Sequence, residues 1–350
     1  MVAVYTDITE LLESGQPVVL ARIIRQTGST PRSIGTACLV LPDGSVKGTI
    51  GGGSLEYQVI QKAKEVFQNK RSALLEFRLT GHDVAETDMI CGGLVDVYLE
   101  PVFPGKSSGI ELFRETQAML SAGRQVIMVT RVAPETAADD RGVRALVRQD
   151  GSMLGGLLDG GPGEKDLLRE MLGCKRAAIR EPDDATDGQR LFLEPLKPDS
   201  VLYLFGAGHV STFVAPLAVL AGFRVVVIDD REEFANTSRF PQADSILVCP
   251  ITKAFENIDI NPAAYIAIIT RGHIHDHEVL EAALRSSQPA YIGMIGSLRK
   301  RNLIYRALQQ TGVSAERIAQ IHSPIGLAIG AETPEEIAVS IVAELIHVRA

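Results

Sequence analysis

Apolar strands alternate with helical segments through the second half of the chain, and this alternation restricts the fold more than any other feature. Strands are expected at residues 201–205, 224–228, 245–249, 265–270 and 290–295. Continuous apolar strands separated by helices form a parallel sheet that is covered on both faces. The pattern predicts an α/β protein in which residues 198–350 form a Rossmann-like doubly wound sheet with strand order 3-2-1-4-5.

A glycine-bearing turn follows the first of these strands. Gly206 permits a tight turn, and Gly208 permits a pyrophosphate to approach the N–H groups at a helix N-terminus. Asp229 ends the second strand about 20 residues later, where it can bind a ribose diol and repel a 2′-phosphate, so NAD is favoured over NADP. Ser211 replaces the third glycine of the fingerprint. The turn predicts a nucleotide-binding domain, the alternative being a Rossmann domain without a ligand.

Four of the seven histidines are expected near one mouth of this sheet. They are His209, His273, His275 and His277. Thr270, His273 and Asp276 follow the fourth strand, where they are expected to line a ligand or cap a helix. Asp276 follows His275 directly, so the ligand spacing of metallo-hydrolases is missing and no metal ligand is assigned. Solvated surface histidines are the alternative interpretation.

Two sections of the first half, about residues 5–104 and 109–198, resemble each other. Each has a helix end, a strand, an Asp-Gly hairpin that leads into glycines and a helix, and a closing strand that contains Leu-Glu-Pro. These landmarks predict an α+β domain over residues 1–197 with an internal duplication. The alternative is a coincidence of common hairpin patterns.

Only the first copy carries chemically distinctive loops. Its candidate binding residues are Arg32, Gly51, Gly52 and Gly53. The three glycines precede a helix that Ser54 can cap, which predicts an anion cradle, although a simple connecting turn is the alternative. Arg32 supplies a bidentate donor for phosphate or an oxo group. Cys91, followed by two glycines, is the candidate catalytic thiol, with a small core residue as the alternative.

The charge balance and the termini restrict the possible partners. The 35 basic and 43 acidic residues give a net charge of −8, and no basic run is long enough to coat a phosphate backbone, so nucleic acid is an unexpected partner. No segment approaches the apolar length of a membrane span, and the first residues do not resemble a secretory signal, so we expect a cytoplasmic protein. The four cysteines contain no C-x-x-C pair.

The motifs resemble those of the XdhC/CoxI family, the accessory factors of xanthine dehydrogenase and related molybdenum hydroxylases. The resemblance rests on residues 28–32, 48–56, 91–93, 206–210, 229–231, 239–241, 270–273, 291–297 and 323–327. It implies that the chain binds the molybdenum cofactor (molybdopterin, alone or as a dinucleotide), protects it while a cysteine desulfurase installs its sulfur, and delivers it to an apo molybdenum hydroxylase. Ser297 joins the expected cofactor-binding residues through the fifth-strand motif.

Three other functions remain open. An NAD-dependent oxidoreductase would use His209 or His273 as acid or base. A metal-dependent hydrolase would use the cluster from His273 to His277. A pure adaptor would only dock hydroxylase and desulfurase. The resemblance favours a cofactor-binding chaperone over a stand-alone enzyme and leaves a homodimer open.

Overall fold

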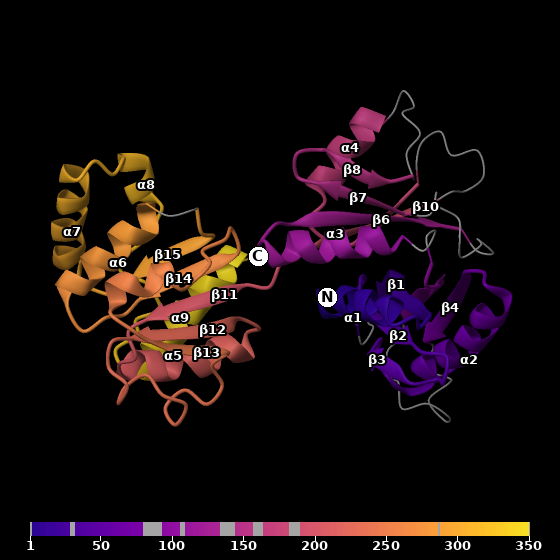
Figure 1. Cartoon of the computed structure of the whole chain (residues 1–350), viewed down its shortest axis with the longest axis horizontal. Coiled ribbons are helices and arrows are strands. Elements are labelled where there is room, and N and C mark those ends of the chain that lie inside the picture. Colours follow the sequence, from indigo (N-terminus) through magenta and orange to yellow (C-terminus); the bar gives the residue numbers. More distant parts are fainter. Residues whose placement is uncertain are drawn as a thin grey trace. The chain divides into compact units, whose positions relative to one another are not determined.

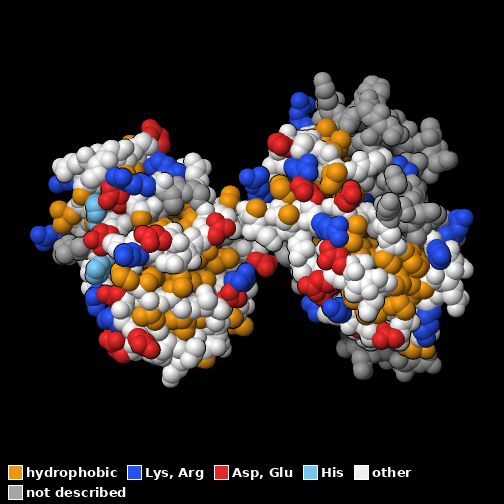
Figure 2. Space-filling view, in the orientation of Figure 1, with side chains coloured by type: hydrophobic (Ala, Val, Ile, Leu, Met, Phe, Trp, Pro, Cys, Tyr) orange, Lys and Arg blue, Asp and Glu red, His pale blue; other side chains and the backbone are white. Residues whose placement is uncertain are grey.

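The chain divides into two compact units, Met1–Lys197 and Pro198–Ala350 (Figure 1). The structure is a computed structural model that describes residues 2–28, 32–79, 93–105, 109–133, 144–156, 164–181, 190–285 and 288–349. No helix within these ranges is both long and apolar enough to cross a bilayer. Figure 2 shows acidic and basic side chains intermixed over the described part of the visible face, so that face offers no extended basic surface.

The second unit is built on a six-stranded parallel sheet. Its strands are β11 (Val201–Phe205), β12 (Arg224–Asp229), β13 (Ser245–Val248), β14 (Ala264–Ile268), β15 (Tyr291–Met294) and β16 (Ile321–His322). They lie in the order β13-β12-β11-β14-β15-β16. The order 3-2-1-4-5 is confirmed, and the sheet has one further strand at its edge. The sequence did not indicate β16, because two residues are too few for a strand pattern.

Helices cover both faces of this sheet (Figure 1). Buried side chains of α5 (His209–Leu220) and α9 (Pro334–Arg349) pack with Leu202 and Leu204 on one face. Tyr203 and Phe205 point to the other face, where they pack with η3 (Ile251–Glu256), α6 (His273–Arg285), α7 (Leu298–Gln310) and α8 (Ala315–Ala319). This two-sided burial explains why the strands are apolar at successive positions.

The first unit contains two antiparallel sheets with the same strand order. One has the order β3 (Val46–Gly48), β2 (Ala37–Val40), β1 (Val18–Gly28), β5 (Gly93–Val102), β4 (Ala73–Leu79). The other has the order β8 (Met153–Gly155), β7 (Arg144–Arg148), β6 (Val126–Val132), β10 (Arg190–Leu196), β9 (Ala178–Arg180). The helices of the first unit are α1 (Val2–Glu13), α2 (Gly53–Asn69), α3 (Ile110–Ser121) and α4 (Glu164–Gly173).

The strand registers support the internal duplication. Leu20 pairs with Glu100 in the first sheet, and Met128 pairs with Glu194 at the corresponding position of the second. The two glutamates belong to the repeated Leu-Glu-Pro sequences of the closing strands. The repeat therefore extends from sequence landmarks to the pairing of individual residues.

A buried charge network joins the two sheets at these glutamates. Arg22 lies 2.8 Å from Glu100 and 3.1 Å from Glu194, measured between guanidinium nitrogens and carboxylate oxygens. Arg144 lies 2.8 Å from the other oxygen of Glu100. The hydroxyl of Tyr5 donates a 2.5 Å hydrogen bond to Glu194. Two arginines thus balance two glutamates from both copies, so removal of one partner leaves an uncompensated buried charge.

We predict that Arg22→Met lowers the free energy of unfolding of the first unit by about 3–5 kcal/mol, because both glutamates lose a buried partner. Chemical denaturation followed by circular dichroism measures the change. Arg114→Met is the control, since Arg114 pairs with Glu13 while their side chains are 54% and 47% exposed, and it should cost less than about 1 kcal/mol. Equal losses in the two variants would contradict a network that depends on burial.

Candidate functional site

Most of the predicted site residues of the second unit lie at one edge of its sheet. In a parallel sheet all carboxyl ends meet at the same edge, and ligands bind where the chain reverses its direction of strand addition. Here that switch point lies between β11 and β14. The strand ends and loops at this edge carry Gly206, Asp229, Thr270 and Ser297. The topology therefore brings together residues that are far apart in sequence.

Gly206 and Gly208 are glycines for different reasons. Gly206 has a φ of 104°, and a Cβ there would lie 2.2 Å from the carbonyl oxygen of Ile269, so only glycine fits. Gly208 has a φ of −74°, and a Cβ there would meet no atom within 4 Å. Neither the backbone conformation nor internal packing requires glycine at position 208. The absence of a side chain there leaves open space that is available to a ligand.

The helix that follows this turn has an uncapped N-terminus. Gly208 occupies the N-cap position of α5 and offers no side chain, and the first turn contains no acidic residue. Ser211, at the third position of the fingerprint, is buried and donates a 2.5 Å hydrogen bond to the carbonyl of Gly206. The serine thus stabilises the turn and leaves the helix entrance open. This geometry suits a phosphate group.

The carboxylate of Asp229 already accepts hydrogen bonds from other groups of the protein at both of its oxygens. Its Oδ2 accepts hydrogen bonds from the N–H of Ala207 at 2.8 Å and from Nη2 of Arg231 at 3.1 Å. Its Oδ1 accepts from the N–H of Arg231 at 3.1 Å and from Nε at 2.9 Å. Burial raises the pKa of Asp229, but these hydrogen bonds outweigh it and hold the pKa below its usual value. A carboxylate has about four acceptor positions, so a ribose diol would have to displace Arg231.

Arginines lie in the two loops on either side of the glycine turn. The guanidinium carbons of Arg231 and Arg239 lie 3.8 and 4.9 Å from the ring centroid of Phe234. Arg271, in the loop after β14, lies 2.8 Å from Asp230, in the loop after β12. Because β11 lies between β12 and β14, this ion pair links the two loops that flank the glycine turn. Arg231 and Arg271 are engaged with Asp229 and Asp230, so the backbone N–H groups that begin α5 remain the groups of this turn that favour an anionic ligand.

Asp276 and Ser297 hold the start of two neighbouring helices. Asp276 is fully buried and accepts a 2.7 Å hydrogen bond from the Thr270 hydroxyl. Its other oxygen pairs with Lys300 of α7, whose ammonium also donates to the carbonyl of Ile295 at 3.2 Å. Ser297 is the N-cap of α7, where its hydroxyl accepts from the N–H of Lys300. These residues fix where α6 and α7 begin.

The histidines that were predicted to lie near one end of the sheet differ in their exposure and contacts. His209 is exposed in the first turn of α5, and His275 pairs with Glu278 at 3.2 Å. His277 lines a pocket between α6 and α7. The side chain of His273 lies outside the described part. Within that part, no three side chains of His, Cys, Asp or Glu are grouped so that they could hold a metal ion.

The glycine loop of the first unit already contains a carboxylate. Gly51, Gly52 and Gly53 have φ values of 135°, 72° and 60°, which only glycine adopts readily. Helix α2 begins at Gly53 and its N-cap is Gly52, so the prediction that Ser54 caps it is wrong. Glu56 Oε2 accepts from the N–H groups of Ile50 at 3.4 Å and Gly52 at 3.3 Å. An incoming phosphate would have to displace Glu56.

The other two candidates of the first unit, Arg32 and Cys91, lie at or beyond the limits of the described part. Arg32 is exposed on the turn before β2. Cys91 lies outside the described residues. Cys38 is buried, and burial raises the pKa of its thiol to about 12, so it is a core residue rather than a nucleophile.

Sequence reasoning missed a histidine and carboxylate pair at the same edge of the second sheet. Nδ1 of His322, at the end of β16, lies 3.1 Å from Oε1 of Glu344 on α9. Glu344 Oε2 accepts from the Tyr291 hydroxyl at 2.5 Å and from the N–H of Gly326 at 2.9 Å. Burial raises the pKa of Glu344, but these partners lower it further than burial raises it. The motif at residues 323–327 was the available signal, because it adjoins His322.

The geometry defines a class of protein, a two-part chain whose second part is a Rossmann domain with an open glycine turn at a helix N-terminus. The family model described as XdhC Rossmann domain matches residues 202–345, and the model described as XdhC and CoxI family matches residues 11–78. Together they cover more than half of the chain. The chain belongs to the XdhC and CoxI family.

Similar proteins support this assignment over nearly the whole chain. A probable xanthine dehydrogenase subunit of Bacillus subtilis (strain 168) is 28% identical over 99% of this chain and 97% of its own length. The molybdenum cofactor insertion chaperone PaoD of Escherichia coli (strain K12) is 23% identical over 97% of this chain and 86% of its own length. The uncharacterized protein YqeB of the same organism is 27% identical over 99% of this chain, which spans 46% of that protein.

A solved structure has the same overall architecture. A crystal structure described as a xanthine dehydrogenase from Bacillus halodurans has a TM-score of 0.68 and 28% sequence identity to this chain. The comparison covers 99% of this chain and 95% of that one.

We predict that Arg231→Met destabilises the second unit by about 1.5–3 kcal/mol at pH 7, because Asp229 loses two charged hydrogen bonds. The folded pKa of Asp229 is depressed, so this stabilisation is present above its ordinary pKa of 3.8 and is lost as the pH falls through the folded value. The difference from the unaltered chain should therefore shrink at acidic pH, which denaturation at several pH values measures. Arg239→Met, which removes only a stacking cation, should cost less at every pH, and a pH-independent loss for Arg231→Met would contradict the pairing.

Proposed function

We propose that this chain is a maturation factor that binds the molybdenum cofactor and delivers it to an apo molybdenum hydroxylase. The names of two relatives, a molybdenum cofactor insertion chaperone and one chain of a probable xanthine dehydrogenase, support this role. The observation that carries the proposal is the open helix entrance at Gly208, where a Cβ would meet nothing within 4 Å and no side chain caps α5. The phosphate of the pterin, or the diphosphate of its dinucleotide form, binds there.

The state of Asp229 favours this role over an NAD-dependent oxidoreductase. An NAD site normally uses this carboxylate to accept hydrogen bonds from the adenosine ribose. Here all of its acceptor positions serve Ala207 and Arg231. A ligand held mainly through a phosphate at the N–H groups that begin α5 fits the turn without displacing them. Turnover of NADH with a small carbonyl compound would favour the oxidoreductase instead.

We assign protection of the cofactor and installation of its sulfur to residues of the first unit. We infer that the chain works in the cytoplasm with a cysteine desulfurase, and that it protects the cofactor while its terminal sulfur is installed. Cys91 is the residue to which we assign contact with the sulfur or the metal, and Arg32 and the glycine loop at residues 51–53 are assigned to the anionic groups of the cargo. If that loop accepts a phosphate, the carboxylate of Glu56 has to leave the N–H groups of Ile50 and Gly52.

Gly208→Val should reduce activation of an apo molybdenum hydroxylase by about tenfold or more, because the side chain fills the space that the phosphate needs. The measurement is hydroxylase activity after incubation with the chain and the cofactor, with apo xanthine dehydrogenase tried first. Gly173→Val is the matched control, since Gly173 also has open space at its Cβ position and no positive φ, but lies on α4 of the other unit. Full activation by Gly208→Val would remove the turn from cofactor binding.

Cys91→Ala should retain cofactor binding but lose activation of the hydroxylase, since the thiol is assigned to the sulfur or the metal rather than to the pterin phosphate. Cys174→Ala is the control. Its thiol is partly buried and donates to the carbonyl of Arg176 at 2.9 Å. Normal activation by Cys91→Ala would exclude the thiol from the mechanism and leave the role of Gly208 untouched.

A further inference from the structure

The nucleotide site of the second unit is open at one end and closed at the other. In a Rossmann domain the diphosphate of a dinucleotide binds at the glycine turn, and the adenosine ribose binds to an acidic residue at the end of the second strand. The first position is open, since a Cβ at Gly208 would meet no atom within 4 Å and no side chain caps α5. The second position belongs to Asp229, the last residue of β12. The state of Asp229 therefore decides whether a dinucleotide can bind at this turn.

Arg231 occupies the positions on Asp229 that a ribose diol would use. Its Nε donates to Oδ1 at 2.9 Å and its Nη2 donates to Oδ2 at 3.1 Å, so the guanidinium binds both oxygens at once. The backbone N–H groups of Ala207 and Arg231 use the remaining acceptor positions. The side chain of Asp229 is 3% exposed, whereas that of Arg231 is 23% exposed. A diol that uses the same two positions can bind only after the guanidinium has left.

Other side chains at the same edge of the sheet hold Arg231 in this position. Its guanidinium carbon lies 3.8 Å from the ring centroid of Phe234. Its Nε also lies 3.7 Å from a carboxylate oxygen of Asp230, and Asp230 in turn pairs with Arg271 at 2.8 Å. The hydrogen bonds to Asp229 raise the pKa of Arg231, so the guanidinium remains charged. The closed end of the site is thus held by stacking and by charge on two carboxylates.

The open end and the closed end belong to one site, because β11 and β12 are adjacent parallel strands. Phe205 pairs with Ile228, so the turn after Phe205 and the end of β12 lie at the same edge of the sheet. The N–H of Ala207, within the turn, donates to Asp229 at 2.8 Å. A ligand that is anchored by a phosphate at the turn and carries a nucleoside on the β12 side would therefore meet Arg231. A ligand whose phosphate is its terminal group would not.

We propose that Arg231 is a specificity-determining residue that takes the place of a ribose diol and keeps dinucleotides out of the turn at Gly208. The turn accepts a terminal phosphate, such as that of a phosphate monoester, because no side chain caps the N–H groups at the start of α5. It rejects NAD and other dinucleotides, whose ribose needs Asp229. For the cargo the inference rests on the proposed function, and there it selects molybdopterin without an attached nucleotide.

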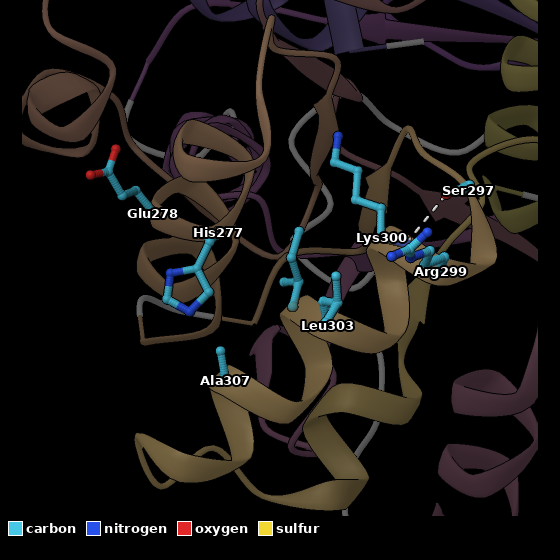
Figure 3. Close-up of a pocket in the computed structure, with 8 residues that line it drawn as sticks. His277, Glu278, Ser297, Arg299, Lys300, Leu303 and Ala307 are labelled. Carbon is cyan, nitrogen blue, oxygen red and sulfur yellow. Dashed lines mark hydrogen bonds between the residues drawn. The ribbon is translucent and has the colours of Figure 1, made fainter.

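Calorimetric titration of the full chain with NAD and with NADP tests the proposal. We expect Arg231→Ala to bind NAD about tenfold more tightly than the unaltered chain, or better, because Asp229 gains two free acceptor positions and keeps two backbone N–H bonds. The affinity for NADP should rise less, since Asp229 repels a 2′-phosphate. Arg299→Ala is the matched control, because Arg299 is exposed on the first turn of α7 and borders the pocket between α6 and α7 (Figure 3). It should leave both affinities unchanged.

Two further variants make the outcome decisive. Asp229→Asn in the Arg231→Ala background should abolish the gain for NAD, because the diol loses its charged acceptor, whereas a gain caused by a loosened loop would persist. Arg231→Lys keeps a cation that cannot bind both oxygens as a fork. It should show a smaller gain, and it provides the test if Arg231→Ala does not fold.

The proposal is overturned if the unaltered chain already binds NAD as tightly as Arg231→Ala. It is also overturned if no folded variant of Arg231 gains affinity, if Arg299→Ala gains as much, or if the double variant keeps the gain. These titrations need no molybdenum cofactor, whereas the delivery role is measured by hydroxylase activation with Gly208→Val. Failure of the selection by Arg231 and failure of the delivery role are therefore distinguishable.

Discussion

The arrangement of the first unit depends on balanced charges in its interior. Arg22 sits between Glu100 and Glu194, and Arg144 completes the set with two arginines facing two glutamates. Each glutamate comes from the closing strand of one copy, so the network forms only when both sheets are packed in register. Apolar contacts alone tolerate small shifts between sheets, but a buried ion pair does not, because a displaced charge loses its partner in a medium of low dielectric constant.

The two glycine turns differ in whether a side-chain carboxylate already binds their backbone N–H groups. In the first unit Glu56 occupies the turn at residues 51–53. In the second unit Asp229 binds the N–H of Ala207 but leaves the entrance of α5 free. At an open helix entrance an anion would gain hydrogen bonds without first displacing a carboxylate. This contrast favours the Rossmann domain as the stronger anion site.

Particular residues explain how far the sequence could predict the site. The switch point and the need for glycine at position 206 follow from local spacing, because a strand that leads through a tight turn into a helix needs that residue type. The interpretation of Asp229 as a ribose ligand depended on its position alone, and the saturating contact with Arg231 was not visible. The pairing of His322 with Glu344 was also missed, since those residues meet only when α9 packs on the sheet.

The sequence by itself determined the alternation of strands and helices, the strand order of the parallel sheet and the duplicated α+β unit. These follow from hydrophobic periodicity and turn chemistry, which act between residues close in sequence. Only the tertiary structure decided which polar groups are already satisfied, as the contact of Asp229 with the N–H of Ala207 and that of His322 with Glu344 show. The physical reason is that hydrogen-bond partners and burial are set by packing between distant elements, which no local pattern encodes.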